Sequence, residues 1–419
     1  MHAGTDTDFS LALTGRDGFT ATGGFGALER ATAHLDAPFA VLSLPALRHN
    51  AADLQRRADG KPIRVASKSI RSRGMLRAVL SLPGFQGILA YALPEALWLS
   101  EEFDDVVVAY PSMDRTALAR LAADARARER VTLMVDSADH LDRLVPFASA
   151  TAPLRVCVDL DASLRLGPSV HLGMRRSPVH SPEEAVALAR DIVRCPGLSL
   201  VGVMSYEGQI AGLGDDAGSF AHRAQIRALR ALSGKELADR RADAVAAVRR
   251  ALEEAGAPAL EFVNGGGTGS FETTAREAAV TELAAGSGLY APTLFDGYRA
   301  FKPQPAAVFA LPVVRRPAPG LVTVLGGGWI ASGPAGQDRV PVPVWPTGLR
   351  LLGTEGAGEV QTPLSGPAAD TLSLGDRVWF RHAKAGELCE HVNTLHLVDG
   401  ERLVASIPTY RGDGKAFLG

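Results

Sequence analysis

Eight short apolar runs alternate with helical patterns between residues 63 and 290 of this 419-residue chain. The runs are continuous rather than interleaved with polar residues, which is typical of parallel strands covered on both faces. Eight strand–helix units in about 230 residues fit an α/β fold, a (β/α)8 barrel, in number and length. A doubly wound open sheet is the structural alternative. The predicted strands are 63–68, 87–92, 105–110, 131–136, 154–161, 198–206, 260–264 and 281–286.

Two helices stand out in the second half of this alternation. Ser181-Pro182-Glu183-Glu184 supplies an N-cap, a proline at the first helical position and a capping-box glutamate, so a helix is predicted to begin there. The segment from about Ser219 to Glu254 is rich in arginine and alanine. It predicts a long helix in two pieces, broken near Ser233-Gly234.

The composition and the hydrophobic pattern change past residue 300, where proline, glycine and valine become more frequent and short predicted strands are bounded by turns. This pattern predicts an antiparallel β domain, and the run Phe39–Leu44 is expected to pair into it. The predicted organisation is a mobile arm at 1–27, a barrel at 28–302 and a β domain at 303–419, with 28–45 partly joining the β domain. The predicted strands are Ala307–Pro312, Leu321–Leu325, Asp376–Arg381, Leu395–Val398 and Arg402–Ile407.

The composition excludes several classes of function. The chain is 46% hydrophobic with a formal net charge of −2, and it has no basic block of the kind that binds nucleic acid or an anionic membrane. No apolar run is long enough to span a bilayer, and the amino terminus lacks the features of a secretion signal. Three widely spaced cysteines make a disulfide framework improbable. We therefore expect a cytoplasmic protein with neither a membrane nor a nucleic-acid partner.

Lys68 ends the first predicted strand, in the run Ile63-Arg-Val-Ala-Ser-Lys-Ser69. Burial lowers the pKa of a lysine, and an unprotonated amine is what a Schiff base with a carbonyl cofactor requires. Most lysines that follow a strand are simply solvated, so this residue alone does not identify a site.

Two glycine-rich loops follow the seventh and eighth predicted strands. Asn264-Gly-Gly-Gly-Thr-Gly-Ser270 lets backbone amides close on a phosphate, and Ala285-Gly-Ser-Gly-Leu-Tyr290 is placed to form the second wall. The first loop has the wrong spacing and position for a dinucleotide-binding fingerprint, and a plain glycine turn is the simpler alternative. The loops after strands seven and eight are where barrels commonly hold phosphates.

Polar residues also follow strands five and six. Tyr206-Glu-Gly-Gln209 leaves the sixth strand, and an arginine in Gly173-Met-Arg-Arg-Ser-Pro178 could hydrogen-bond the phenolic oxygen of a pyridine cofactor or pair with Asp159 or Asp161. Because a barrel closes on itself, strand one neighbours strand eight. Lys68 and the two glycine loops would then span a pyridoxal 5′-phosphate, with the aldehyde at Lys68 and the phosphate in the glycine loops.

From about residue 30 onward the chain resembles the alanine-racemase-like (fold type III) pyridoxal-phosphate enzymes, and within them the D-threonine aldolase and D-serine dehydratase branch. It looks closest to the actinobacterial group of amino acid deaminase/aldolases. Besides the motifs above, the resemblance rests on Asp36-Ala-Pro-Phe39, Val313-Val-Arg-Arg-Pro317, Gly375-Asp-Arg-Val378, His382-Ala-Lys-Ala-Gly-Glu-Leu388 and Pro408-Thr-Tyr-Arg-Gly412.

The resemblance implies Lys68 as the Schiff-base and catalytic lysine, Arg176 as a contact to the ring oxygen, and Tyr206 and Gln209 beside the cofactor. It also implies a homodimer acting on a small amino-acid substrate, each site lying between one barrel and the partner's β domain. The implied phosphate contacts are Gly266, Gly267, Thr268, Ser287 and Tyr290, and Gly265, Gly269 and Gly288 are further predicted cofactor-binding residues.

The second domain departs from the branch at its metal site. Relatives carry a divalent metal on a His-x-Cys or His-x-Asp pair shortly after the Gly-Asp-Arg-Val strand. Here Glu387 and Cys389 keep the i, i+2 spacing, which would put both on one face of a strand, with His382 and His391 nearby. His382, Glu387 and Cys389 could bind zinc or manganese. Cys389 could equally pack as a small hydrophobe with no metal bound.

The function that these features favour is a pyridoxal-phosphate lyase acting on a β-hydroxy D-amino acid, by retro-aldol cleavage or by dehydration. A racemase is the alternative, but it needs a second base, and Tyr410 is the only tyrosine beyond Tyr298. A non-catalytic cofactor carrier is a third reading, and a barrel without cofactor is a fourth.

Overall fold

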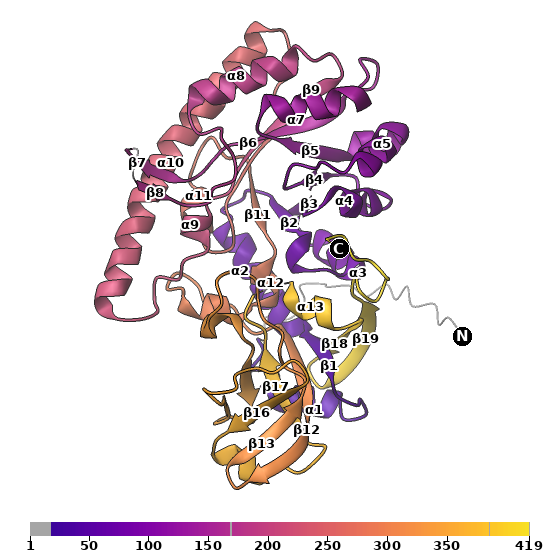
Figure 1. The fold of residues 1–419 in the computed structure, drawn as a ribbon, viewed down its shortest axis with the longest axis vertical. Coiled ribbons are helices and arrows are strands. Elements are labelled where there is room, and N and C mark those ends of the chain that lie inside the picture. Colours follow the sequence, from indigo (N-terminus) through magenta and orange to yellow (C-terminus); the bar gives the residue numbers. More distant parts are fainter. Residues whose placement is uncertain (1–17, 168–169, 385, 419) are drawn as a thin grey trace.

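A computed structural model describes residues 18–167, 170–384 and 386–418. Its first part is a closed barrel of eight parallel strands in the order β10-β11-β2-β3-β4-β5-β6-β9, which confirms the predicted fold (Figure 1). Val65 of β2 pairs with Ala285 of β11, so the first and last barrel strands are neighbours as expected. The strands are β2 (Ile63–Ala66), β3 (Phe85–Ala90), β4 (Val106–Val108), β5 (Val131–Val135), β6 (Leu154–Asp159), β9 (Leu198–Ser205), β10 (Phe262–Gly265) and β11 (Glu282–Ala285).

Helices cover the outside of the barrel. In the predicted capping box before α8, Ser181 Oγ accepts the Glu184 amide at 3.2 Å and the Glu184 carboxylate accepts the Ser181 amide at 2.9 Å. The longer helices are α2 (Leu44–Arg57), α3 (Arg73–Leu80), α4 (Leu93–Ser100), α5 (Arg115–Ala123), α6 (Ala125–Arg130), α7 (Ala138–Leu144), α8 (Pro182–Val193) and α10 (Phe220–Glu254). Short helices α9 (Gly208–Ala211), α11 (Phe271–Thr274) and α12 (Ser287–Tyr290) follow the last three strands.

The break predicted near Ser233-Gly234 is wrong, because α10 is one continuous helix of 35 residues. A glycine inside a helix costs only about 1 kcal/mol relative to alanine, which is too little to interrupt a helix held by tertiary contacts. Ser233 is buried, and its Oγ accepts a hydrogen bond from Gln209 at 3.1 Å. The amino-terminal end of α10 projects beyond the barrel (Figure 1).

The second part is a nine-stranded sheet in the order β15-β16-β13-β12-β1-β18-β19, with β17 pairing β12 and β14. β1 (Phe39–Ser43) lies between β12 and β18, as predicted for the run at 39–44. The β1–β18 pair is parallel, so the sheet is not wholly antiparallel. Its other strands are β12 (Ala307–Ala318), β13 (Leu321–Leu325), β14 (Val342–Trp345), β15 (Arg350–Leu351), β16 (Gln361–Ser365), β17 (Arg377–Arg381), β18 (Thr394–Asp399) and β19 (Arg402–Pro408).

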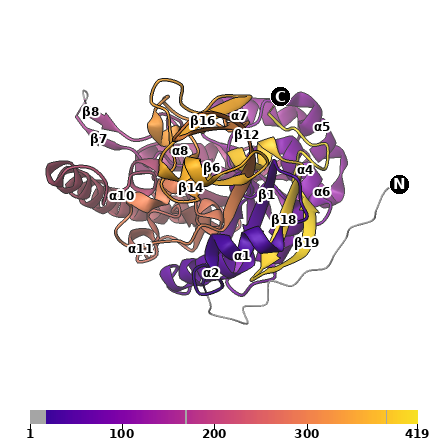
Figure 2. The same ribbon diagram turned by 90° about the horizontal axis from the view of Figure 1, so that it is seen from below.

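The amino-terminal region joins this sheet. Helix α1 (Gly24–Ala31) is held there because the Glu29 carboxylate accepts hydrogen bonds from Arg377 and from Trp379 Nε1. Figure 2 shows α1, β1, β18 and β19 together at the lower face. Of the predicted mobile arm at 1–27, residues 1–17 lie outside the described residues, and the domain boundaries remain a prediction. Within the described ranges, no helix is both long enough and apolar enough to cross a membrane.

Candidate active site

Lys68 lies at the carboxyl end of β2, where catalytic groups of barrels gather. The strand ends at Ala66, two residues before the predicted end. Lys68 lies in the 3-10 turn that follows, Ser67–Ser69, and it is exposed between two buried serines. Its carbonyl accepts a hydrogen bond from Arg71 Nε at 2.9 Å. The turn therefore fixes the Lys68 backbone at the carboxyl end of β2 and leaves the residue exposed.

The two glycine loops lie beside this turn, because β10, β11 and β2 are successive strands of the barrel. A Cβ on Gly286 would lie 2.5 Å from the Ala66 carbonyl oxygen, so the β11 loop contacts the end of β2. The Gly288 amide donates to Thr268 Oγ1 at 3.1 Å, which joins one loop to the other. The structure thus brings together Lys68 and both loops.

In the loop after β10, two backbone carbonyls are bound by arginines, while two backbone amides are left without a partner among the described residues. Arg57 Nη2 donates to the Thr268 carbonyl at 2.5 Å and Arg230 Nη2 to the Gly269 carbonyl at 2.7 Å. The N–H and C=O of a peptide point in opposite directions, so holding the Thr268 carbonyl turns the Gly269 amide the other way. Among the described residues the amides of Thr268 and Gly269 make no hydrogen bond. A loop with fixed carbonyls and unused amides fits a phosphate.

A buried ionic network supports the loop from beneath. The Glu207 carboxylate accepts the Gly266 amide at 3.1 Å and Ser270 Oγ at 3.0 Å, and it pairs with Arg241 at 3.1 Å. Arg241 also pairs with Glu277 at 3.1 Å, and burial raises the pKa of Glu277 to about 7. Because both members of the central pair are almost fully buried, loss of either would leave an uncompensated charge under the loop.

Close packing explains the remaining glycines of the β10 loop. A Cβ on Gly265 would lie 2.7 Å from Arg241 Nη1, and one on Gly267 would lie 3.0 Å from the Tyr206 ring. On Gly269 it would overlap the Ala211 carbonyl oxygen. The glycines let the loop approach α9 and Tyr206 more closely than any side chain would allow.

Arg176 stands between two aromatic rings at the barrel mouth. Its guanidinium carbon lies 5.5 Å from the Tyr110 ring centroid and 6.0 Å from that of Tyr206. Asp161 is paired with Arg165 at 2.6 Å, and among the described residues Arg176 makes no ion pair. Of the two roles considered for Arg176, the structure leaves its guanidinium available for an anionic oxygen.

Three other predicted contacts lie around this centre with different roles. Gln209 Nε2 donates to the Ala162 carbonyl at 2.5 Å, so its side chain braces the loop after β6. Ser287 begins α12 and makes no side-chain hydrogen bond among the described residues. Tyr290 is fully buried, and its hydroxyl donates to the Ile70 carbonyl at 3.0 Å. That hydroxyl is therefore committed to the turn after Lys68 rather than free for a phosphate.

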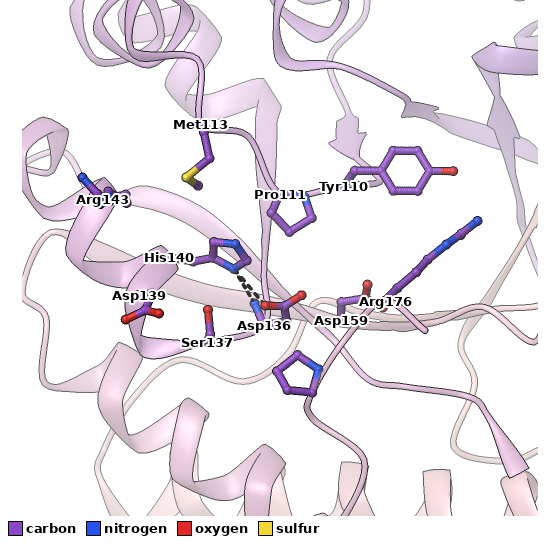
Figure 3. Close-up of a pocket in the computed structure, with 11 residues that line it drawn as sticks. Tyr110, Pro111, Met113, Asp136, Ser137, Asp139, His140, Arg143, Asp159 and Arg176 are labelled. Carbon is purple, nitrogen blue, oxygen red and sulfur yellow. Dashed lines mark hydrogen bonds and ion pairs between the residues drawn. The ribbon is translucent and has the colours of Figure 1, made fainter. Parts of the chain in front are cut away.

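A cavity of about 590 Å³ opens beside Arg176 at the ends of β4, β5 and β6 (Figure 3). His140 Nδ1 lies 2.9 Å from the Asp136 carboxylate within it. Burial and the nearby charge of Asp136 raise the pKa of Asp159 to about 7, with Arg176 opposing the shift. The sequence interpretation missed His140, although its i, i+4 spacing from the aspartate that ends a predicted strand was a usable signal.

Comparison with known proteins identifies the family. The family model described as "Alanine racemase, N-terminal domain" matches residues 42–293. The chain belongs to this family. It is 28% identical over 305 residues to a D-threonine aldolase of Arthrobacter sp, covering 70% of this chain and 72% of that protein. It is 27% identical over 260 residues to a 3-hydroxy-D-aspartate aldolase of Paracoccus denitrificans (strain Pd 1222), covering 60% of each.

The fold agrees with this assignment. The crystal structure of D-threonine aldolase from Filomicrobium marinum matches with a TM-score of 0.73 and 23% identity, covering 91% of this chain and 96% of that one. The predicted resemblance to the alanine-racemase-like proteins and their D-threonine aldolase branch is confirmed. Membership of the alanine racemase family implies pyridoxal 5′-phosphate as cofactor, and the lysine and glycine loops fit it.

The metal ligands predicted from family resemblance are not gathered into a site. The strand expected to carry Glu387 and Cys389 is wrong: Glu387–His391 forms helix α13, in which residues i and i+2 do not face the same way. Cys389 Sγ donates to the Ile70 carbonyl at 3.4 Å, and the Ser332 amide donates to Glu387 at 3.1 Å. His382 is 1% exposed. Across the described ranges, no three His, Cys, Asp or Glu side chains are placed to hold a metal ion. The predicted set does not fit a metal.

Tyr410, the candidate second base of an alanine-racemase-type reaction, is also committed elsewhere. Its hydroxyl donates to Glu95 Oε1 at 2.9 Å, and the residue is 3% exposed. The Trp98 ring packs against it edge-on with centroids 5.1 Å apart. The hydroxyl lies within a buried pair with Glu95.

Proposed function

We propose that this chain is a pyridoxal-phosphate-dependent lyase that acts on a β-hydroxy D-amino acid. The observation that carries the proposal is the meeting of Lys68 with the glycine loops of two neighbouring strands, at the end of the barrel where such enzymes work. The names of its relatives support the reaction class, because they are aldolases of D-threonine and of 3-hydroxy-D-aspartate.

The residues take distinct parts in this proposal. Bound pyridoxal phosphate supplies an electron sink for the charge left on Cα when a bond there breaks. The Thr268 and Gly269 amides would hold its phosphate, with Ser287 on the facing loop. Arg176 would hold the ring oxygen. Lys68 would bind the cofactor through Nζ, and once displaced by substrate its free amine could accept or return a proton at Cα.

The proposal includes two reactions at Cβ: cleavage of the Cα–Cβ bond, or loss of the Cβ hydroxyl. Cleavage of a D-threonine-like substrate gives glycine and an aldehyde, whereas dehydration of a D-serine-like substrate gives a keto acid and ammonia. The racemase alternative lacks support, because the Tyr410 hydroxyl is bound to Glu95. We also propose a cytoplasmic homodimer, supported for the dimer by apolar side chains exposed on the β domain, such as Ile330 (56%) and Val360 (63%).

The test is spectroscopic and chemical. The purified protein should show a cofactor absorbance band that is lost when borohydride reduces the Schiff base, and D-threonine or D-serine should perturb the band and yield acetaldehyde or pyruvate. Lys68→Ala should lose both the band and the products. Lys235→Ala, on the exposed face of α10, is the matched control and should keep both. A persistent, unchanged band in Lys68→Ala would refute the assignment.

A further inference from the structure

Gly386, which follows β17 and precedes α13, lies directly against the turn that carries Lys68. Gly386 has a φ of +104°, and a Cβ there would lie 2.6 Å from the Lys68 carbonyl oxygen. It would also lie 3.3 Å from Arg71 Nε, which itself donates to that carbonyl. Only glycine allows this approach. Lys384 lies two positions before Gly386 in the chain, so its backbone is within about 7 Å of that glycine.

Lys384 is fixed where the chain before Gly386 meets the loop after β13. Its Nζ donates to the Ser332 carbonyl at 3.2 Å, while the Ser332 amide donates to the Glu387 carboxylate at 3.1 Å. The side chain of Lys384 is thus held by a backbone group rather than free in solvent. Burial lowers the pKa of Lys384, and the charges of Arg339 and Lys68 lower it further, with Glu387 opposing. Lys384 and Lys68 are close enough for their charges to interact.

The other cations near this place have carboxylate partners. Arg71 is paired with Glu390 and Arg339 with Asp338. Among the residues that the structure describes, Lys384 makes no ion pair, and its hydrogen-bond partner is a neutral carbonyl. Two like charges held near each other favour an anion between them. An amino acid reacting at Lys68 brings one as its carboxylate, and retro-aldol cleavage develops negative charge on the Cβ oxygen as the hydroxyl loses its proton.

We propose that Lys384 binds an anionic oxygen of the substrate at Lys68, and that it thereby selects substrates that carry one. This inference rests on the proposed lyase function and adds a residue that neither the glycine loops nor Arg176 supplies. The two candidate groups are the carboxylate and the Cβ hydroxyl, whose oxygen becomes negative as its proton leaves, and they can be separated by ligand structure.

The experiment measures ligand affinity from the change in the cofactor absorbance band, independently of turnover. Three ligands separate the groups: D-threonine, D-alanine, which lacks the Cβ oxygen, and D-threoninol, which lacks the carboxylate. Lys384→Gln should leave the unliganded band unchanged and weaken D-threonine binding by about tenfold or more, as expected for a lost charged hydrogen bond. Lys384→Arg should recover most of the affinity, and Lys302→Gln on the surface should behave like the wild type.

The pattern across ligands gives the source of the oxygen. Equal weakening of D-threonine and D-alanine, with D-threoninol unaffected, assigns Lys384 to the carboxylate. Weakening of D-threonine and D-threoninol, with D-alanine unaffected, assigns it to the Cβ oxygen. If the wild type responds and Lys384→Gln binds each of the three ligands as tightly as the wild type does, the inference is overturned while the lyase proposal stands. If the wild type takes up no cofactor, both are overturned.

Discussion

Glu95 on α4 offers a measurable test of how this fold tolerates a buried carboxyl near Lys68. Its side chain is fully buried, with Oε1 accepting from Tyr410 at 2.9 Å and Oε2 from the Tyr91 amide at 2.7 Å. Burial raises the pKa of Glu95 from its ordinary value of 4.5 to about 7, against the opposing hydrogen bonds from Ser67, Tyr91 and Tyr410. We predict that Glu95→Gln stabilises the protein above pH 7.

The magnitude follows from the pKa of Glu95. Between pH 4.5 and 7 the folded chain keeps a proton that the unfolded chain has released. Stability therefore falls with rising pH by about 1.4 kcal/mol per pH unit and by about 3 kcal/mol in total. Glutamine carries no such proton. It keeps an acceptor for one of the two hydrogen bonds and loses about 1 kcal/mol at the other. The variant should be about 1 kcal/mol less stable at pH 4.5 and about 2 kcal/mol more stable at pH 8.

Chemical denaturation of both proteins at pH 4.5, 6 and 8 measures this difference. Asp159 and Glu277 also have pKa values raised to about 7, but they contribute equally to both proteins and cancel in the comparison. Glu254→Gln, at an exposed ion pair with Arg190, is the control and should change stability by less than about 0.5 kcal/mol at each pH. A wild-type–variant difference that does not change with pH would refute the reasoning.

Three further substitutions test the site. Gly269→Ala drives a Cβ into the Ala211 carbonyl and should weaken pyridoxal phosphate binding by at least about tenfold in a fluorescence titration; unchanged binding would show that the loop does not hold the cofactor. Glu207→Ala leaves Arg241 without its main partner and should lower the free energy of unfolding by about 3–5 kcal/mol, measured by chemical denaturation. Tyr410→Phe should cost about 1 kcal/mol of stability and keep lyase activity, and loss of activity in a folded variant would restore a catalytic role for its hydroxyl.

The barrel could be predicted from sequence because its strands are buried on both faces and therefore stand out as continuous apolar runs. All eight were found to within two residues at each end. The β domain was harder, since its outer strands are short and carry prolines, as at Pro343 in β14 and Pro363 in β16. The predicted break in α10 is wrong because the low helix propensity of Gly234 is outweighed by tertiary contacts such as the hydrogen bond from Gln209 to the buried Ser233.

The site was partly predictable for a related reason. Lys68 and the glycine loops follow strands, so a correct strand order is enough to bring them together. Arg57 and Arg230 reach the β10 loop from positions 211 and 39 residues away from their partners, and Arg241 reaches Glu207 beneath that loop across 34 residues. No local pattern indicates where such side chains end. The strand expected at Glu387 and Cys389 was wrong because a five-residue helix stands there, and in a helix residues i and i+2 do not share a face.

The β domain does more than cover the barrel, because its last segments hold the turn that carries Lys68. The Ile70 carbonyl accepts from Cys389, the Arg71 carbonyl accepts the Tyr410 amide at 2.8 Å, and Ser72 Oγ donates to the Pro408 carbonyl at 2.8 Å. These contacts all fall within four residues of the lysine. A barrel alone would keep the Tyr290 hydrogen bond to the Ile70 carbonyl but lose these three contacts, so the placement of the turn depends on both parts of the chain. That dependence favours an enzyme that needs a fixed lysine over a carrier that only binds its cofactor.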